Sequence, residues 1–487
     1  MKSRLFTSLI LLACAGSCWA DWNQWRGPNR DGKAPNAELP DSWADDFTPA
    51  KLWESEEIPS DHYGGHGSVS IAEGKVYAAI VWHRDEPTTT RTLTSRDMSN
   101  LGYRGNDFSE ELMAKVEETR MNVNPRLRGK MLDDWSKKWT GEHLNEQQLL
   151  KYEGWVVSRF KQGKTAIPWA DLELMNSIVN NEFENHNAFL KWVEEQEWKD
   201  EASAGKLIEQ MPNTKMAAND VIVCVSLETG ETLWKFEVPG NPTGRSSSST
   251  PAVADGIVYG MLSGVLYAVD ADNGEELWNF EMEKRRAVSS SPMVADGKVF
   301  IQLGQLTALD GKTGEVVWAS DAVRTNVSSP AVWKDFVICN DNKELVGVDI
   351  DTGEEKWRQP AGGQGTPAVS GDHVAVISNN VGLKLFRLSI EGAQEVWTKE
   401  FTTRRYNETP IIHDGHVYHL GGARHTCVDL ESGDTKWEVE RSSNISSPIL
   451  ADGKFLVLEN NGGFLAMVDA TPQDHQLLGR TKIGAMS

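Results

Sequence analysis

Residues Ala308–Trp318 read ALDGKTGEVVW, and this stretch decides the fold class of the 487-residue chain. An apolar segment leads to an aspartate, a Thr-Gly-Glu turn follows, and a tryptophan ends the phrase. The pattern predicts two short strands joined by a tight turn, because glycine takes up positive φ at little cost. The phrase recurs about every forty residues, a spacing typical of repeat folds. Its copies end at Trp234, Trp278, Trp318, Trp357, Trp397 and Trp437.

A second repeated phrase stands before each copy, as in STPAVADGIVYG of Ser249–Gly260. Pro-x-Val starts a short inner strand, Asp-Gly forms a hairpin turn, and alternating apolar residues continue as the next strand. The two phrases together supply four short strands per period, which is typical of a propeller blade. We therefore expect an all-β propeller of four-stranded antiparallel blades. Each repeated tryptophan should lie on the outermost strand and pack its ring against the neighbouring blade.

The repeats contain seven sets of three inner strands but eight candidate outer strands. The first set begins at Gly67–Val69 and the last at Ser447–Pro448. An orphan outer strand is expected at Lys51–Glu54, around Trp53, and one without tryptophan near Leu477–Ile483. Propellers usually close by pairing strands from their two ends. We predict an eight-blade plan with one incomplete blade, or else seven blades, with residues 21–60 as an N-terminal strap and Trp53 as a seventh docking tryptophan.

A long segment without the repeat interrupts the first blade at residues 83–219. Its windows show helical spacing of apolar residues, for example Leu149, Tyr152, Val156 and Phe160. We expect an α-helical insertion here, with the propeller formed by residues 61–82 and 220–483. Such an insertion is either a passive decoration or a lid or docking surface for a partner.

The first twenty residues have the pattern of a secretory signal peptide, with cleavage expected after Ala20. A lipoprotein anchor through Cys14 or Cys18 is the alternative. We predict an exported protein of the periplasm or cell envelope, with no transmembrane segment after the signal. The formal net charge of −22 argues against a nucleic-acid partner, because phosphate binding needs clustered Lys and Arg.

Few residues have the spacing that catalysis or metal binding requires. Three cysteines follow the signal, an odd number that is typical of small buried residues on strands: Cys224, Cys339 and Cys427. Four histidines gather in one segment, but His416 and His419 point to opposite faces of a strand and cannot easily share a metal. No nucleophile elbow, Walker loop or dinucleotide fingerprint is present. We predict no catalytic residue and no metal site.

Arginines recur in the connections that lead from one blade to the next. Guanidinium groups held together suit carboxylates, phosphates or acidic side chains of a partner. If the connections converge on the channel mouth, these arginines form a binding face; otherwise they are solvated loop charges. The candidate residues are Arg245, Arg285, Arg286, Arg324, Arg404, Arg405 and Arg441.

The repeated AxDxxTGExxW phrase resembles the repeat of pyrroloquinoline-quinone-like (PQQ-like) propellers, over most of residues 51–483 apart from the insertion. That group includes quinoprotein dehydrogenases and the non-enzymatic outer-membrane assembly factor BamB with its relatives. The opening WNQWRGPNRDG, Trp22–Gly32, is similar to the start of exported BamB-like proteins of planctomycete-type bacteria.

For an enzyme, the resemblance implies adjacent cysteines that form a disulfide beside the quinone, and a Glu, Asn and Asp cluster that holds Ca²⁺. The chain has no Cys-Cys pair, and the calcium motif cannot be matched residue by residue. We expect a non-enzymatic binding or scaffold protein of the envelope, with a protein partner and without PQQ or Ca²⁺. The alternatives are a PQQ-dependent dehydrogenase and a binder of an anionic ligand or polysaccharide at the arginine face.

Overall fold

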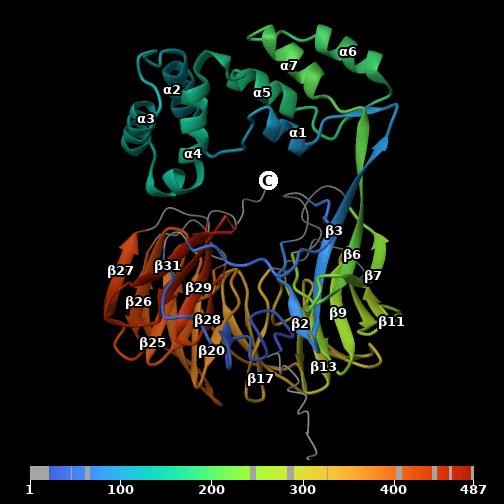
Figure 1. Ribbon diagram of the computed structural model, residues 1–487, viewed down its shortest axis with the longest axis vertical. Helices are drawn as coiled ribbons and strands as arrows, with labels where there is room; N and C mark the ends of the chain where they lie inside the picture. The colour runs from blue at the N-terminus through green and yellow to red at the C-terminus, as the bar shows by residue number, and fades with distance from the viewer. Residues whose placement is uncertain are drawn as a thin grey trace, which may run out of the picture.

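The computed structural model describes residues 21–44, 47–60, 66–241, 248–281, 290–325, 327–401, 408–440, 447–459 and 463–483. The expected signal peptide, residues 1–20, lies outside these ranges. The described residues form an all-β propeller, with a layer of helices over one face (Figure 1). The hydrophobic core is divided into clusters that lie mainly between neighbouring blades, as flat sheets packed face to face require.

The described residues form seven blades of four antiparallel strands, in chain order from the innermost strand outward. Blade 1 contains β2 (Ser70–Ala72), β3 (Lys75–Pro87), β6 (Thr214–Ser226) and β7 (Thr232–Pro239). Blade 2 contains β8 (Ala252–Ala254), β9 (Ile257–Leu262), β10 (Val265–Asp270) and β11 (Glu276–Glu281). Blade 3 contains β12 (Met293–Ala295), β13 (Lys298–Gln302), β14 (Leu306–Asp310) and β15 (Val316–Ser320). Blade 4 contains β16 (Ala331–Trp333), β17 (Phe336–Asn340), β18 (Leu345–Asp349) and β19 (Glu355–Gln359).

The three remaining blades follow the same order. Blade 5 contains β20 (Ala368–Ser370), β21 (His373–Ser378), β22 (Gly382–Ser389) and β23 (Gly392–Glu400). Blade 6 contains β24 (Ile411–His413), β25 (His416–Leu420), β26 (Arg424–Asp429) and β27 (Thr435–Glu440). Blade 7 contains β28 (Ile449–Ala451), β29 (Lys454–Glu459), β30 (Phe464–Asp469) and β31 (Leu477–Lys482). A short N-terminal strand, β1 (Lys33–Ala34), adds to blade 7 in parallel with β28.

The hairpin turns have the geometry that the Asp-Gly pairs predict. Asp255 and Gly256 join β8 to β9 with φ of 52° and 74°, so both central residues are left-handed, as in a type I′ turn. The second turn ends in a glycine that is also left-handed, for example Gly314 with φ of 74°. The tryptophan follows this glycine by four residues, as Trp318 follows Gly314.

A bulge between the two outer strands accompanies the docking of five repeat tryptophans on the next blade. In blade 2, Ala268 pairs with Trp278, but the next residue, Val269, pairs with Glu276. The Trp278 indole Nε1 donates a hydrogen bond of 3.1 Å to the carbonyl of Gly311 in blade 3, and its ring covers Gly314. The same type of bond to the following blade is made by Trp234, Trp318, Trp397 and Trp437.

Trp357 is the exception, and the altered repeat of blade 5 explains why. The copy RLSIEGAQEVW shifts its glycine, and this residue, Gly392, lies against the Cβ and Cγ atoms of Trp357 instead of the far part of the indole ring. The Trp357 ring instead lies against Gly347 of its own blade, where a Cβ atom would clash with the indole. Gln359 donates a hydrogen bond of 2.8 Å to the blade 5 carbonyl of Ala393 and supplies a polar link between the blades.

Gly314→Ala is expected to destabilise the protein more than Gly297→Ala. Both glycines have similar φ, 74° and 70°, so the left-handed strain of alanine is alike, about 1–2 kcal/mol. A Cβ on Gly314 would lie 2.6 Å from the Trp278 ring, whereas Gly297 has no heavy atom within 4 Å. The clash with the Trp278 ring should therefore destabilise the Gly314→Ala variant by about 1–3 kcal/mol more than Gly297→Ala. Urea denaturation of both variants measures this difference. Equal losses would show that the ring contact contributes nothing.

The helical insertion is joined to blade 1 by one long hairpin. Strands β3 and β6 pair as far as Pro87 and Thr214, several residues beyond the boundaries 83 and 219 that the sequence suggested. The insertion contains α1 (Ser95–Asn100), α2 (Glu110–Met121), α3 (Lys130–His143), α4 (Glu146–Gln162), the 3-10 turn η1 (Gly163–Thr165), α5 (Trp169–Asn176), α6 (His186–Glu194) and α7 (Ala202–Gln210). A two-stranded sheet of β4 (Arg91–Thr92) and β5 (Glu182–Phe183) completes it. Figure 1 places these helices over the face toward which β7 and β27 run.

The orphan outer strand expected at Lys51–Glu54 is not formed, since those residues have no ladder partner. Trp53 nevertheless docks on blade 1, where its Nε1 donates to the carbonyl of Leu227 at 2.8 Å and its ring covers Gly230. Upstream, the Trp43 ring lies against Gly479 of β31, the outer strand that lacks its own tryptophan. The strap therefore supplies two rings at the junction of blades 7 and 1 without forming the expected outer strand.

Candidate functional site

The central channel contains an N-terminal segment of the chain, residues 22–34, which we call the axial segment. Trp22 forms an antiparallel bridge with Ile71 of blade 1. The carbonyl of Asn23 accepts a hydrogen bond of 2.7 Å from Val253 of blade 2. In Figure 1 this part of the chain, in dark blue, lies among the inner strands.

The rest of the axial segment contacts four further blades. Trp25 Nε1 donates to Thr366 Oγ1 of blade 5 at 2.9 Å, and Gln24 Oε1 accepts from Val294 N of blade 3 at 3.1 Å. Arg26 reaches blade 6, and β1 pairs with β28 of blade 7. Six of the seven blades thus form hydrogen bonds with one short segment, which fills the channel and connects the blades to one another.

Hydroxyl groups just before the inner strands of blades 2, 3 and 4 link neighbouring blades around the same channel. Thr250 N donates to Ser291 Oγ at 3.0 Å, and Ser291 N donates to Ser329 Oγ at 2.9 Å. Ser68 N in turn donates to Thr250 Oγ1 at 2.8 Å. At these three Ser/Thr-Pro pairs the hydroxyl oxygen of Thr250, Ser291 or Ser329 therefore accepts from a backbone N–H of the preceding blade and satisfies it.

Two arginines of the axial segment are buried in the channel. Arg26 and Arg30 are each 3% exposed, and both have left-handed backbone angles, with φ of 65° and 56°. Burial lowers the pKa of Arg26 to about 10 and, with the added repulsion from Arg26, lowers the pKa of Arg30 to about 9. Both guanidinium groups are still charged at neutral pH, so the channel centre is positive.

The predicted arginine face falls almost entirely outside the described residues. Arg245, Arg285, Arg286, Arg404, Arg405 and Arg441 all lie there. Arg324 is described, and its exposed side chain forms an ion pair of 3.5 Å with Asp321 on the same loop. The seven arginines therefore stay a prediction as a binding face.

The histidines of residues 413–425 form separate pairs. His419 Nε2 lies 2.9 Å from Glu408 Oε2, and His425 Nδ1 lies 2.9 Å from His475 Nε2. His416 is on the opposite face of β25 and contacts the carbonyl of Asp414. Within the described ranges, no group of three or more His, Cys, Asp or Glu residues could hold a metal ion. The cysteines of blades 1, 4 and 6 are buried free thiols.

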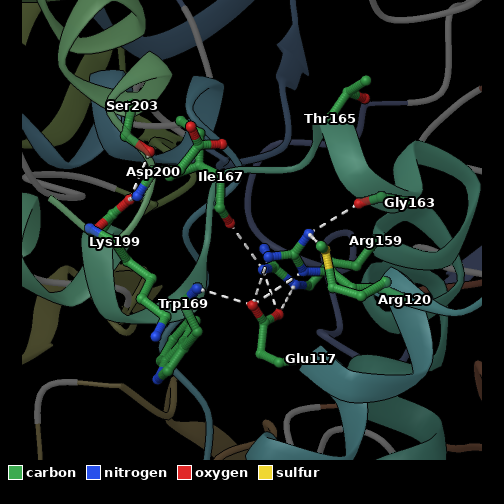
Figure 2. A network of polar contacts seen from close by, with 12 residues as sticks. Glu117, Arg120, Arg159, Gly163, Thr165, Ile167, Trp169, Lys199, Asp200 and Ser203 are labelled. Carbon is green, nitrogen blue, oxygen red and sulfur yellow. Dashed lines mark hydrogen bonds and ion pairs between the residues drawn. The ribbon is translucent and has the colours of Figure 1, made fainter.

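The insertion contains a buried polar network of its own (Figure 2). Glu117 of α2 forms ion pairs with Arg120 at 2.8 Å and with Arg159 of α4 at 2.5 Å. Its carboxylate also accepts from the backbone N–H of Trp169 at 3.0 Å. A second carboxylate, Asp171, caps the loop before α7 by accepting from two backbone N–H groups and a serine hydroxyl. These contacts join α2 to α4 and to the start of α5, and join α5 to the start of α7.

The donor set of the channel does not fit Ca²⁺ with PQQ. Calcium needs six to eight oxygen ligands, whereas the axial segment brings two guanidinium cations to the channel centre. The three described thiols lie in different blades and form no disulfide. The residues that occupy the axis would repel a divalent cation rather than bind it.

Sequence reasoning missed the role of the axial segment, although it singled out WNQWRGPNRDG as a motif. This stretch of eleven residues contains two tryptophans, two arginines and two glycines, which is more than an extended surface segment needs. Gly27 and Gly32 have φ of 83° and 77°, and a Cβ on either would meet Trp22 or Arg26. This concentration of large and conformationally special residues indicates that the segment is buried, but it does not show against which part of the protein the segment packs.

Comparison with known proteins places the repeats in a family. The model of the family described as outer membrane protein assembly factor BamB matches residues 196–301, 218–359 and 262–474. BamB of Yersinia pestis is 22% identical over 265 residues, which is 50% of this chain and 65% of the relative. The quinohemoprotein alcohol dehydrogenase of Comamonas testosteroni is 28% identical over 170 residues, 30% of this chain and 24% of the relative.

The chain thus spans less than two thirds of the length of both curated relatives. Among solved structures, BamB from Moraxella catarrhalis matches with a TM-score of 0.44 and 17% identity, over 55% of this chain and 82% of that one. The family matches together cover more than half of the chain. With its repeated Trp-docking blades, the chain belongs to the BamB family of PQQ-like β-propellers.

Proposed function

We propose that this protein is an exported, non-enzymatic propeller that binds a protein partner in the cell envelope. The observation that carries the proposal is the axial segment. A propeller offers a small substrate its central channel, because that is its concave, enclosed site. Here the channel contains residues 22–34 bonded to six blades, so the outer surfaces are what the molecule offers for binding.

The curated relatives point to two classes of function. BamB proteins are named as assembly factors of the outer membrane, whereas the quinohemoproteins are named as alcohol dehydrogenases. The unsuitable donor set of the channel favours the first class, and we propose that neither PQQ nor Ca²⁺ is required. No helix among the described residues is both long and apolar enough to cross a membrane.

The helical layer is the surface that we assign to the partner. It has two apolar cores of its own, so it does not depend on the propeller for its packing. Besides the β3–β6 hairpin, an ion pair of 3.8 Å between Glu146 of α4 and Arg424 of β26 joins it to the propeller. Exposed Met121 and Met131 add adaptable apolar contacts, which suit a protein surface.

Replacing residues 88–213 by Asn-Gly tests this assignment. Pro87 and Thr214 are paired, so a two-residue turn closes the shortened hairpin without strain. The shortened protein should melt close to the intact one but lose the envelope protein that cross-links to the intact chain. Retention of that cross-link would contradict the helical layer as the docking surface.

Two further measurements make the proposal specific. Met131→Lys should reduce cross-linking about tenfold, whereas Ile390→Lys, at an exposed turn of blade 5, should not. Purified protein mixed with PQQ and Ca²⁺ should show no dye-linked alcohol oxidation. Saturable quinone binding with oxidation would favour the dehydrogenase alternative and overturn the non-enzymatic proposal.

A further inference from the structure

Two positive charges are buried in the channel without a carboxylate partner. Among the described residues, neither Arg26 nor Arg30 forms a salt bridge, although both are 3% exposed. Asp31 is the nearby carboxylate, and its charge raises the pKa of Arg26. That carboxylate is already shared with Lys33, whose Nζ lies 3.7 Å away. An uncompensated buried cation is costly, so this arrangement requires a negative charge.

Within the described part of the chain, each guanidinium donates hydrogen bonds from one of its nitrogens. Arg26 Nη2 donates to the carbonyls of Asp31 at 3.3 Å and Pro410 at 3.1 Å. Arg30 Nη1 donates to Pro292 O at 3.0 Å and to Gln24 Oε1 at 3.4 Å. The buried atoms Nε and Nη1 of Arg26 and Nε and Nη2 of Arg30 have no acceptor among the described residues.

Buried hydroxyls stand beside both arginine contacts. Thr409 precedes Pro410, whose carbonyl accepts the hydrogen bond from Arg26. The Oγ1 atom of Thr409 has no hydrogen-bond partner among the described residues. Ser290 lies two residues before Pro292, whose carbonyl accepts the hydrogen bond from Arg30. The Oγ atom of Ser290 also has no hydrogen-bond partner within the described ranges. Within the described ranges, the axial segment therefore has unpartnered buried guanidinium nitrogens, and the strand starts of blades 3 and 6 that it contacts have unpartnered buried hydroxyls.

We propose that Arg26 and Arg30 bind a small inorganic anion, phosphate or chloride, inside the channel. A guanidinium presents N–H donors in a planar fork that suits an anion, and two forks with hydroxyls supply several donors. The anion offsets the repulsion between the two arginines and bridges blades 3 and 6 through the axial segment. Both arginines belong to the axial segment and not to the repeat.

The test compares thermal stability in different anions at constant ionic strength. Purified protein is dialysed into sodium gluconate, whose anion is too large for a buried site, and then titrated with sodium phosphate or sodium chloride. Saturating anion should raise the melting temperature by about 3–6 °C, since a ligand that binds only the folded state stabilises it. The two titrations distinguish the oxyanion from the halide.

Arg30→Met removes one guanidinium and keeps an apolar side chain of similar length. The variant should lose most of the anion-dependent shift, whereas Arg387→Met, which changes an exposed arginine outside both candidate sites, should keep it. Crystals of the unaltered protein soaked in sodium bromide give a readout that does not depend on a variant folding. An anomalous peak in contact with both guanidinium groups is expected. An equal response to all anions together with no peak at that position would overturn the proposal.

Discussion

Removing Trp22–Ala34 while keeping the segment that precedes it is expected to lower the melting temperature by about 5–10 °C. The deletion removes the bridge to Ile71, the pairing of β1 with β28 and the side-chain bonds to blades 3, 5 and 6. Lost hydrogen bonds contribute about 1 kcal/mol each and the two part-buried tryptophans about 2 kcal/mol each. Removal of two buried cations offsets part of this loss, so the net effect is about 5 kcal/mol.

A matched control variant separates the packing of the Trp25 ring from the hydrogen bond that its Nε1 donates to Thr366. Trp25→Phe keeps an aromatic ring and removes only the bond from Nε1 to Thr366, so it should cost about 1 kcal/mol. Both variants can be followed by differential scanning calorimetry. A synthetic peptide of residues 21–34 added to the truncated protein should restore most of the lost stability, because the channel that receives it is formed by the blades. An unchanged melting temperature for the truncated protein would show that the axial segment is not structural.

Glu117→Gln is expected to destabilise the helical layer by about 3–5 kcal/mol while the propeller stays folded. Arg120 and Arg159 are 4% exposed or less, and the substitution leaves both buried without a counter-charge (Figure 2). Breaking a buried pair in this way is more costly than never having formed it. Hydrogen exchange should therefore accelerate in α2 and α4 and not in the inner strands. Glu118→Gln, which changes the exposed neighbouring residue, should alter the free energy of local opening measured by hydrogen exchange by less than about 0.5 kcal/mol.

The same carboxylate predicts a dependence on pH. Burial acts to raise the pKa of Glu117, but hydrogen bonds and charges from Arg120 and Arg159 outweigh burial and lower it. A carboxyl whose pKa is lower in the folded state stabilises fully above its unfolded value of about 4.5, and this contribution is lost as the pH falls through the folded value. The stability difference between the intact protein and Glu117→Gln should therefore shrink below pH 4.5. A difference that stays constant on acidification would contradict the ion pair.

Much of the propeller could be predicted because its repeats are local. Asp255 and Gly256 form the turn expected of an Asp-Gly pair, and Trp278 reaches the next blade as its spacing suggested. The strand expected at Lys51–Glu54 is absent because a strand needs a partner, and the pairing of distant segments is not visible in a single phrase. Trp53 docks there all the same, since a ring needs only a glycine to lie against.

The candidate site was harder to predict than the fold. The arginines chosen from the blade connections share a position in the repeat, and a shared position says nothing about convergence in space. Arg26 and Arg30, by contrast, lie outside the repeat, and no periodic pattern marks them. Their burial follows from the left-handed turns between Gln24 and Gly32, which fold the side chains back into the channel.

The sequence by itself determined the period of the repeat, the turn type, the docking tryptophans and the presence of a helical insertion. These features depend on residues a few positions apart, whose φ preferences and apolar spacing act locally. Only the tertiary structure decided that residues 22–34 fill the channel. Their partners are mostly backbone carbonyl and N–H groups of six blades, spread from Ile71 to Ala451. Every residue carries such groups, so only the closed ring of blades, which brings them to one axis, shows where the segment binds.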